Sequence, residues 1–304
     1  MPELPEVETI RRGLNKFILK SKLQKVEVLC PKSFIGTPTT GKIIGIRRFG
    51  KALVLDMNNS YSMLVHLRMT GQLIYDPNDG PGLNPSHHPK DGPELNPPHH
   101  TRYAAGHPSD NFTASLPNKQ TRVILEFDTG TLYFNDQRKF GFIKVIATKD
   151  VEQDSFISKL AKEPWDMDAS EFYEKLQRHK NSIIKAVILD QTVICGLGNI
   201  YADEALFASK IHPARRVGSV TSEETELLLR SARQVMERSI ESGGSTMATY
   251  VKADGTKGDY LEQFAQVFRR EGKPCPACGQ TIIKTKIAGR GTHLCPNCQR
   301  MSDD

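Results

Sequence analysis

The chain has 304 residues, enough for two modest domains that each bury a core of their own, whereas a third small module would need a metal or disulfide staple. It has no signal-peptide pattern and no long apolar run, which argues against membrane spans and disulfides and predicts a cytoplasmic protein, nucleoid-associated in a bacterium. The formal net charge is +6, and residues 269–300 hold seven Lys and Arg against the single acid Glu271, either as a solvated tail or as a surface for a polyanion such as DNA.

The first predicted element is an amphipathic helix over residues 6–20. Its apolar side chains recur at spacings of three and four residues, which places them on one helix face. These side chains are Val7, Ile10, Leu14, Phe17 and Ile18.

Pro2 and Glu3 precede this helix and are candidates for a nucleophile and a proton shuttle. Removal of Met1 before a small second residue would leave proline as the first residue, with a secondary amine. An α-amino group titrates near ~7.7 to 8, well below the ~10.4 of lysine, so a useful fraction is an unprotonated nucleophile at neutral pH. Such an amine can attack C1′ of a sugar, displace the base and form an iminium that permits loss of phosphate, with Glu3 shuttling protons. Met-Pro-Glu also opens many chains whose terminus is inert.

From residue 22 to residue 148 the pattern changes to short β-branched runs that are typical of strands. The turn Asp128-Thr129-Gly130 joins the last two runs as a hairpin. This half therefore predicts a β-sandwich or barrel. The runs cover residues 26–28, 43–46, 52–55, 63–67, 123–127 and 131–134.

A segment rich in Pro and Gly interrupts these strands. The sequence DGPGLNPSHH at residues 79–88 recurs as DGPELNPPHH at residues 91–100. Two copies cannot build a repeat architecture, and the composition cannot bury a core, so we expect a flexible insertion. Five of the nine histidines lie between His87 and His107, which leaves adventitious metal binding as a less favoured reading.

After about residue 150 the apolar spacing becomes helical. A short helix is predicted over residues 200–209. Another helix is predicted to begin at the capping box formed by Thr221 and Glu224 and to end at Gly243-Gly244. Strands followed by helices predict an α+β fold or separate domains rather than a parallel sheet. The helical apolar positions include Leu176, Ile183, Ile184, Val187 and Ile188.

Four of the six cysteines form two CxxC pairs separated by sixteen residues: Cys275, Cys278, Cys295 and Cys298. This spacing is typical of a tetrahedral zinc site with four thiolate ligands. Four protein ligands leave no open position, so the zinc would be structural. The residues between the pairs predict a β-hairpin with Arg290 near its tip.

Several motifs, in the same order along the chain, resemble the formamidopyrimidine-DNA glycosylases. The resemblance covers nearly the whole chain except the repeat insertion. The motifs are MPELPEVET at residues 1–9 followed by Arg11-Arg12-Gly13, RRFGK at 47–51, HLRMTG at 66–71, NDQRKFG at 135–141, GLGNIYA at 196–202 and the four cysteines.

The resemblance implies an α+β fold in three parts. An N-terminal helix and a β-sandwich would form the catalytic domain over residues 1–150, with the flexible insertion at 77–117. A helical domain with a helix-two-turn-helix motif would follow over residues 151–268 and carry a lesion loop at 245–260. A zinc-finger β-hairpin would occupy residues 269–304.

The same resemblance implies the catalytic residues. Pro2 would be the Schiff-base nucleophile and Glu3 the general acid at the sugar. Glu6 would lie near the damaged base. Lys51 would contact phosphate and assist β-elimination, and Arg290 would contact phosphate in the minor groove and assist δ-elimination.

Met69, Arg138 and Phe140 match the family's trio that fills the gap left when a damaged nucleotide leaves the stack. Extrusion costs a few kcal/mol in stacking and pairing, and an apolar plug with a stacked aromatic ring recovers part of that cost. Arg138 can donate to the orphaned cytosine, which would favour lesions opposite C.

Residues 185–199 resemble the helix-two-turn-helix. Gly196 and Gly198 allow a tight turn whose free backbone N–H groups precede a helix, which would make a phosphate site, with Asn199 as the cap and as a phosphate contact. Where many relatives carry a histidine pair, this chain has Gln120 and Arg122, so we expect basic residues there to replace it. The full set of expected DNA contacts, besides the trio, is His66, Lys119, Arg122, Lys139, Lys180, Lys185, Asn199 and Tyr201.

Residues 246–260 resemble the loop that closes over an extruded 8-oxoguanine and should move without DNA. Thr246, Tyr260 and the loop's backbone amides are the candidates for gripping the base.

The leading hypothesis is a bifunctional glycosylase and lyase that binds damaged double-stranded DNA as a monomer, without a membrane, and holds one zinc ion. A sister hypothesis is an endonuclease VIII-like enzyme for oxidised pyrimidines; Leu4, Val7, Arg138 and Phe140 favour the purine branch. A noncatalytic zinc-ribbon protein would explain the charge and the cysteines but not Pro2, Glu3 and Lys51.

Overall fold

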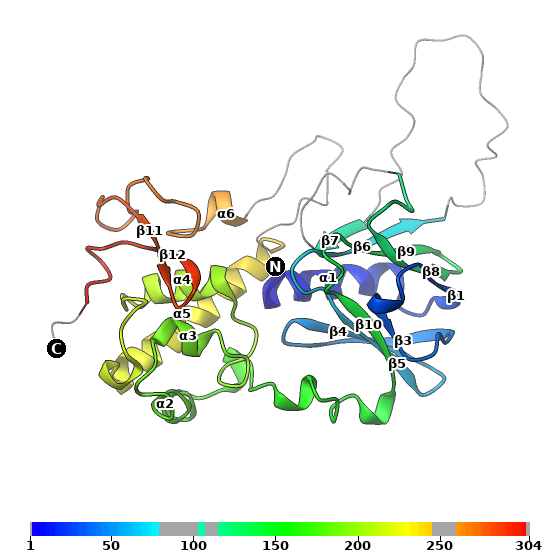
Figure 1. The fold of residues 1–304 in the computed structure, drawn as a ribbon, viewed down its shortest axis with the longest axis horizontal. Helices are drawn as coiled ribbons and strands as arrows, with labels where there is room; N and C mark the ends of the chain where they lie inside the picture. The colour runs from blue at the N-terminus through cyan, green and yellow to red at the C-terminus, as the bar shows by residue number, and fades with distance from the viewer. Residues whose placement is uncertain (1, 79–102, 107–114, 245–259, 302–304) are drawn as a thin grey trace, which may run out of the picture.

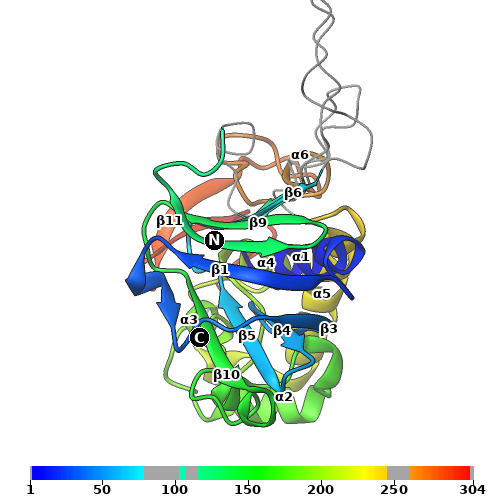
Figure 2. The ribbon, with the colours of Figure 1, turned by 90° about the vertical axis from the view of Figure 1, so that its right-hand side faces the viewer.

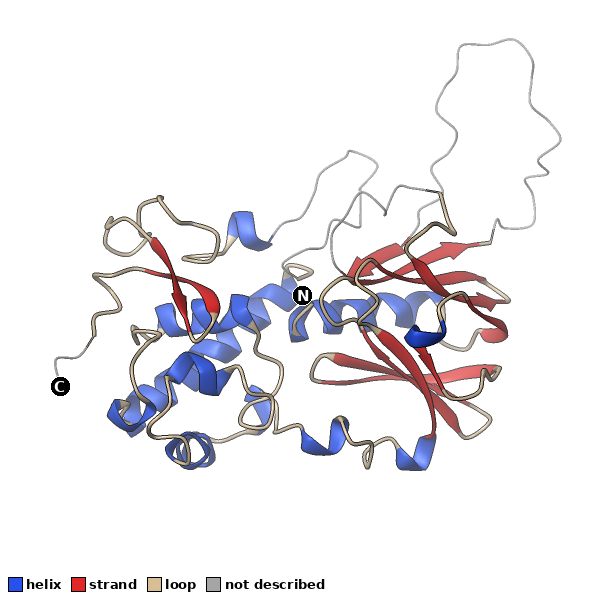
Figure 3. Ribbon diagram, in the orientation of Figure 1, coloured by secondary structure: helices blue, strands red, loops and turns tan. Residues whose placement is uncertain are grey.

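The structure is a computed structural model that describes residues 2–78, 103–106, 115–244 and 260–301. The sequence repeat and Thr246 of the predicted lesion loop lie outside these residues. Strands gather in the N-terminal half and helices in the C-terminal half, with the first helix reaching from one half to the other (Figures 1 and 3). The α+β fold predicted from the sequence is confirmed.

Helix α1 (Leu4–Phe17) begins two residues earlier than predicted. Its first turn is stabilised by the Glu6 carboxylate, which accepts a hydrogen bond from the backbone N–H of Glu3 at 2.8 Å. The face with Ile10 and Leu14 packs into the core of the strand domain, whereas Leu4 packs with the helices of the other half. One helix therefore holds its N-terminus at the boundary between the two halves.

The strands form two layers that Figure 2 shows one above the other. In order, β2, β10, β5, β4 and β3 make one layer and β1, β8, β9, β6 and β7 make the other. The layers are joined where β1 pairs with β3, at Lys22 and Leu23. The predicted β-sandwich is confirmed. The strands are β1 (Lys22–Val28), β2 (Phe34–Ile35), β3 (Gly41–Phe49), β4 (Ala52–Met57), β5 (Tyr61–His66), β6 (Gly71–Pro77), β7 (Tyr103–Gly106), β8 (Thr121–Phe127), β9 (Gly130–Asp136) and β10 (Phe142–Ala147).

The six predicted strand runs are all present, and the hairpin turn between β8 and β9 lies at Asp128-Thr129. Four strands were not predicted: β2, β6, β7 and β10. Strand β7 lies inside the predicted flexible insertion, so that prediction is wrong for residues 103–106. These residues pair with β6, and the Tyr103 hydroxyl donates to the carbonyl of Thr9 in α1 at 3.1 Å.

The helical half is built around α5, whose predicted capping box is confirmed. The hydroxyl of Thr221 accepts from the N–H of Glu224 at 3.2 Å, and the carboxylate of Glu224 accepts from the N–H of Thr221 at 2.9 Å. Gly243 and Gly244 follow the end of the helix, as predicted, and both have positive φ. The helices are α2 (Ala169–Gln177), α3 (Ile184–Ile188), α4 (Asn199–Ala208), α5 (Ser222–Glu241) and α6 (Tyr260–Gln263).

The C-terminal module is a hairpin of β11 (Ile283–Ile287) and β12 (Arg290–Leu294) that lies between the two cysteine pairs in the sequence. Ile282 and Cys295 pack against Phe207 at the end of α4, which docks the module on the helical domain. Short 3-10 turns connect the other elements, at Pro31–Ser33, Thr148–Asp150, Ile157–Lys159, Pro164–Asp166 and Val217–Ser219. Among the described residues, the helices are too short or too polar to cross a bilayer.

Candidate active site and nucleic-acid interface

The carboxylate of Glu3 lies at the N-terminus of α4. It accepts hydrogen bonds from the backbone N–H groups of Gly198 at 2.8 Å, Ile200 at 3.0 Å and Tyr201 at 3.4 Å. Only 2% of Glu3 is exposed. A helix N-terminus attracts an anion because its first N–H groups lack helical partners and its dipole is positive there. The anion at this helix is therefore a side chain of the chain itself.

This arrangement corrects two predictions. The N–H groups of the glycine turn were expected to be free for phosphate, but Glu3 already accepts from Gly198 and Ile200. Asn199 was expected to cap the helix, yet the cap position is Gly198, and the Asn199 amide donates instead to the carbonyl of Gly291 at 2.9 Å. The capping side chain comes from a residue far away in sequence, so local pattern could not reveal it.

Gly198 is required by the close approach of Glu3. A Cβ atom at residue 198 would lie 2.2 Å from Cδ of Glu3, far inside van der Waals contact. The neighbouring Gly196, with φ of +98°, leaves 2.4 Å between such a Cβ and Leu4. The turn is therefore shaped to receive the start of α1.

Burial raises the pKa of Glu3 to about 7, although the nearby positive charge of Lys51 acts to lower it. The negative charge of Glu6 also raises the pKa. A carboxyl group that is part protonated near neutral pH can either give or take a proton, which suits acid–base work.

Lys51 lies in the turn between β3 and β4 and faces the same loop. Its ammonium donates to the carbonyl of Leu197 at 2.6 Å. Burial lowers the pKa of Lys51, while the charge of Glu3 acts to raise it. The turn is fixed by Arg48, whose guanidinium pairs with Glu8 of α1 at 3.0 Å and with Glu163. Arg48 belongs to the RRFGK motif, but no role was predicted for it.

Arg290 begins β12 at the tip of the zinc-module hairpin, where it is exposed. Its charge is close enough to Lys51 to lower the pKa of that lysine. The next residue, Gly291, accepts from both Asn199 of α4 and Lys185 through its carbonyl. The structure thus brings Glu3, Lys51 and Arg290 to one place, with Pro2 buried directly before Glu3.

Lys185 is not at the surface, which contradicts the predicted direct contact with DNA. Its side chain is 0% exposed, and the ammonium pairs with Asp203 of α4 at 2.6 Å and donates to Thr292 of β12 at 2.7 Å. Burial lowers the pKa of Lys185. A phosphate cannot reach a fully enclosed ammonium, so Lys185 instead holds the Arg290 hairpin against α4.

Tyr201 is fully buried as well, which contradicts its predicted contact with DNA. Its hydroxyl donates to the carboxylate of Glu6 at 2.5 Å and lies 2.6 Å from the hydroxyl of Ser239 in α5. Glu6 also approaches Gly244, where a Cβ atom would lie 3.4 Å from the Cα of Glu6. Glu6 therefore lies between Tyr201 of α4 and Gly244, which follows α5.

Met69, Arg138 and Phe140 come together on the surface of the strand domain, although two different turns carry them. Met69 is 43% exposed and Phe140 is 56% exposed, so both apolar side chains meet solvent. The Arg138 guanidinium donates to Sδ of Met69 at 3.2 Å and lies 5.0 Å from the centre of the Phe140 ring. The three side chains form one exposed cluster, which we call the wedge.

His66 lies at the end of β5, before the turn that carries Met69. Its Nδ1 accepts from the backbone N–H of Arg68 at 3.0 Å. Burial lowers the pKa of His66 to about 3, so the ring is neutral and its hydrogen is on Nε2. The imidazole can therefore donate one hydrogen bond from Nε2.

The remaining expected DNA contacts divide by exposure. Lys119, Lys139 and Lys180 are exposed and free to meet phosphate. Arg122 is buried, and its guanidinium donates to the carbonyls of Asp136 at 2.7 Å and Lys119 at 3.0 Å. The expected replacement of the family's histidine pair by Arg122 is therefore not supported, because its donors face inward. Tyr260 begins α6, at the edge of the residues that are described.

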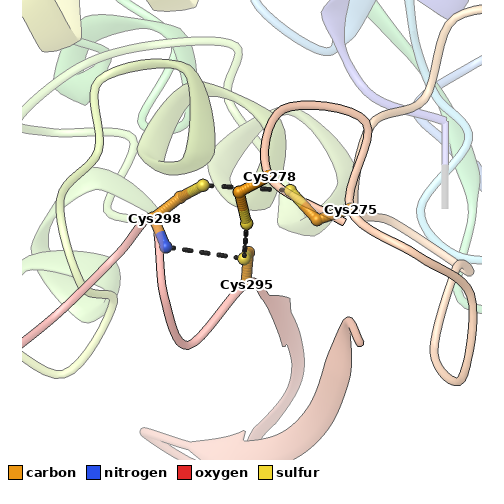
Figure 4. A group of neighbouring side chains, drawn as sticks. All are labelled: Cys275, Cys278, Cys295 and Cys298. Atoms are coloured by element: carbon orange, nitrogen blue, oxygen red, sulfur yellow. Dashed lines mark hydrogen bonds between the residues drawn. The ribbon is translucent and has the colours of Figure 1, made fainter. Parts of the chain in front are cut away.

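The four cysteines lie as a zinc site requires (Figure 4). Their sulfur atoms are all within 4.8 Å of one another, with 3.9 Å between Cys275 and Cys298 and 3.5 Å between Cys278 and Cys295. Thiolates around zinc lie ~3.8 Å apart when each Zn–S bond is ~2.3 Å, whereas a disulfide would bring two sulfurs to ~2.05 Å. The donor set fits one structural zinc ion, as predicted, and the ion would anchor the base of the Arg290 hairpin.

Three family models match the chain over most of its length. They are the formamidopyrimidine-DNA glycosylase N-terminal domain at residues 1–143, the formamidopyrimidine-DNA glycosylase H2TH domain at residues 160–251, and a zinc finger found in FPG and IleRS at residues 272–300. The zinc-finger match agrees with the sulfur geometry.

Similar whole proteins are also found. A formamidopyrimidine-DNA glycosylase of Pelotomaculum thermopropionicum is 37% identical over 99% of this chain and 100% of its own length. A crystal structure of a mutant Lactococcus lactis FPG with Fapy-dG containing DNA is similar with a TM-score of 0.79 and 32% identity, covering 99% of this chain and 100% of that one. A structure of MutM with carbocyclic 8-oxo-G containing DNA has the same TM-score, identity and coverage.

Proposed function

Because the chain belongs to the formamidopyrimidine-DNA glycosylase family, we propose that it excises 8-oxoguanine and formamidopyrimidines from duplex DNA through a Schiff base on Pro2 and then cuts the abasic strand by β,δ-elimination. As a member of this family it is a DNA-binding repair glycosylase with one structural zinc ion. The observation that carries the proposal is the buried carboxyl of Glu3, whose pKa is raised to about 7. This carboxyl follows Pro2 in the chain and interacts electrostatically with Lys51.

Removal of Met1 would give Pro2 a free secondary amine. The nitrogen attacks C1′ of the damaged nucleotide, the glycosidic bond breaks, and the base leaves with the electron pair and gains a proton. The bond from C1′ to O4′ then breaks, and O4′ takes a proton as the sugar opens. The product is an iminium in which the proline nitrogen is doubly bonded to C1′.

Glu3 is the proposed source of the proton for O4′. A carboxyl with a pKa of about 7 is partly protonated near neutral pH, whereas an ordinary glutamic acid is almost fully ionised. Its hydrogen bonds to the N-terminus of α4 stabilise the carboxylate that remains after the proton is given, particularly the bond from Gly198. The same group can later accept a proton.

The iminium acidifies the hydrogen on C2′, and its loss expels the 3′ phosphate in β-elimination. We assign Lys51 to that phosphate, since its ammonium lies beside Glu3 on the β3–β4 turn. A second elimination removes the hydrogen on C4′ and expels the 5′ phosphate, which we assign to Arg290 at the hairpin tip. Water then hydrolyses the iminium and frees Pro2.

We propose that the wedge of Met69, Arg138 and Phe140 fills the gap in the stack. An exposed apolar side chain and an exposed ring can replace part of the stacking lost on extrusion, and Arg138 can donate to an orphaned cytosine. Glu6, fixed by Tyr201, would lie near the extruded base, and the lesion loop with Thr246 and Tyr260 would close over it.

The remaining DNA contacts that we propose come from three exposed lysines and two less exposed side chains. The lysines are Lys119, Lys139 and Lys180, His66 would donate from Nε2 although most of its ring is buried, and Asn199 is half-buried. We further propose that the enzyme acts as a monomer, with its roles divided among residues 1–150, 151–268 and 269–304.

Strand cleavage tests this function. Duplexes would carry 8-oxoguanine or a formamidopyrimidine opposite C, or an oxidised pyrimidine opposite A, and gels would resolve the ends produced. We expect both purine lesions to be removed at least about tenfold faster, leaving phosphate at both sides of a one-nucleotide gap. Faster removal of the pyrimidine would indicate an endonuclease VIII-like enzyme, and binding without excision of any lesion would indicate a noncatalytic zinc-ribbon protein.

A further inference from the structure

The two turns that carry the wedge meet at one buried residue, Asp136. Met69 lies in the turn between β5 and β6, and Arg138 and Phe140 lie in the turn between β9 and β10. Asp136 is the last residue of β9 and is fully buried, so it cannot touch DNA in this arrangement.

The carboxylate of Asp136 accepts hydrogen bonds from both turns. One oxygen accepts from the hydroxyl of Thr70, next to Met69, and from the backbone N–H of Arg138 at 3.1 Å. The other oxygen accepts from the backbone N–H of Gly141 at 2.7 Å. The hydroxyl of Thr70 accepts in turn from the N–H of Arg138 at 3.1 Å, which closes a ring of hydrogen bonds between the turns.

The backbone of both turns needs such support. Arg68 has φ of +52° and Lys139 has φ of +58°, a left-handed conformation that residues other than glycine rarely adopt. Each of these residues lies one position before a wedge residue, Met69 or Phe140. The hydrogen bonds to the buried carboxylate of Asp136 hold both turns in this conformation.

We propose that Asp136 is a positioning residue that sets the distance between Met69 and Arg138 and thereby the selectivity for the base opposite the lesion. The 3.2 Å contact between the Arg138 guanidinium and Sδ of Met69 joins the turns at the surface, and the Asp136 carboxylate joins them beneath. Arg122 completes the support, since its guanidinium donates to the carbonyl of Asp136. The inference rests on the proposed role of the wedge.

The variant Asp136→Asn tests it. Asparagine keeps the shape of the aspartate side chain, but its amide nitrogen cannot accept a hydrogen bond from Gly141. The hydrogen bond from the N–H of Gly141 is therefore replaced by two donors that face each other. We expect kcat/KM on 8-oxoguanine opposite C to fall about tenfold or more, and the preference for C over A opposite the lesion to fall about threefold or more. Cleavage of an abasic site in a single strand, where there is no opposite base and no gap to fill, should stay within about twofold of the wild type.

Two further variants keep the test decisive. Asp56→Asn is the matched control, because Asp56 is a buried carboxylate of the same domain that accepts from Ser62 at 2.6 Å and Arg47 at 2.7 Å, away from the wedge. It should lower the thermal midpoint without changing the preference for C. Thr70→Val removes one link and keeps the Asp136 carboxylate, so it should lower the preference even if Asp136→Asn fails to fold.

The outcomes separate this inference from the proposed function. If Arg138→Ala leaves the preference for C unchanged, the role of the wedge itself fails. If Arg138→Ala abolishes the preference but Asp136→Asn and Thr70→Val retain it, the role of Asp136 fails. Equal losses on duplex and single-strand substrates would also overturn the inference, because they would indicate a general loss of folded protein.

Discussion

The carboxylate of Glu3 accepts a hydrogen bond from the backbone N–H of Gly198 at 2.8 Å, although the two residues are 195 positions apart. This contact joins the start of the strand domain to the helix that follows the glycine turn. It also places the proposed acid where a helix N-terminus stabilises its charge, and it accounts for the absence of a side chain at residue 198.

Substitution of Gly198 should therefore displace the acid. In Gly198→Ala the new Cβ would meet Cδ of Glu3 at 2.2 Å, so the carboxylate must leave the helix N-terminus. We expect excision of 8-oxoguanine to fall about 100-fold, measured as the single-turnover rate. Gly45→Ala is the control, since its nearest neighbour would lie at an ordinary 3.4 Å. Equal activity of the two variants would contradict the tight fit.

The raised pKa of Glu3 predicts how stability changes with pH. Between the ordinary value of 4.5 and the folded value of about 7, the folded state binds more protons than the unfolded state, so the free energy of unfolding falls as pH rises. This effect should total about 3 kcal/mol and should vanish in Glu3→Gln. Urea unfolding at pH 5 and pH 7.5 measures most of it. A difference between wild type and variant that does not depend on pH would be inconsistent with the shift.

Lys180 and Lys185 of the helical domain should differ in their effect on DNA binding. Lys180 is exposed, so its replacement by Gln should lower the slope of log affinity against log salt by about 1. Lys185 pairs with Asp203 in the interior and supports the Arg290 hairpin, so Lys185→Met should lower stability but leave the slope unchanged when Arg290 is already replaced by Ala. A further reduction of the slope by Lys185→Met in the Arg290→Ala protein, measured by fluorescence anisotropy, would restore its role as a phosphate contact.

Loss of zinc should disable the Arg290 hairpin. Cys278→Ser removes a ligand at the base of the module, so we expect weaker DNA binding and a product mixture shifted from δ- toward β-elimination. Cys30→Ser, outside the cluster, should behave like the wild type. A colorimetric chelator would be titrated into the protein, and its colour change would report the amount of zinc released. Full DNA affinity after zinc release would show that the module folds without the metal.

Local patterns predicted the regular elements well. The spacing of Ile10 and Leu14 revealed α1, and the Thr221 and Glu224 pair revealed the start of α5, because both depend on neighbours in sequence. Strand β7 was missed because its short run sits within a Pro-rich and Gly-rich region, and its stability comes from pairing with β6 and from the contact of Tyr103 with α1.

The site was harder to predict than the fold. The sequence shows that residue 185 is a lysine, but it does not show whether the ammonium pairs with a phosphate or with Asp203. The answer depends on how two residues that are 18 positions apart pack in the folded chain. The same limit applies to the cap of α4 by Glu3 and to the support of the wedge by Asp136. The roles of Met69 and Phe140 could be inferred only from family resemblance, because apolar letters alone predict burial, whereas both side chains are exposed.

Trapping of the covalent intermediate tests the central claim most directly. Protein shown by intact mass to lack Met1 would be incubated with an 8-oxoguanine:C duplex and borohydride, which reduces the imine to a stable amine, and the adduct would be mapped by peptide mass spectrometry. We predict a single adduct on the nitrogen of Pro2. An adduct on Lys51 or another lysine, or full activity in protein that retains Met1, would contradict the mechanism.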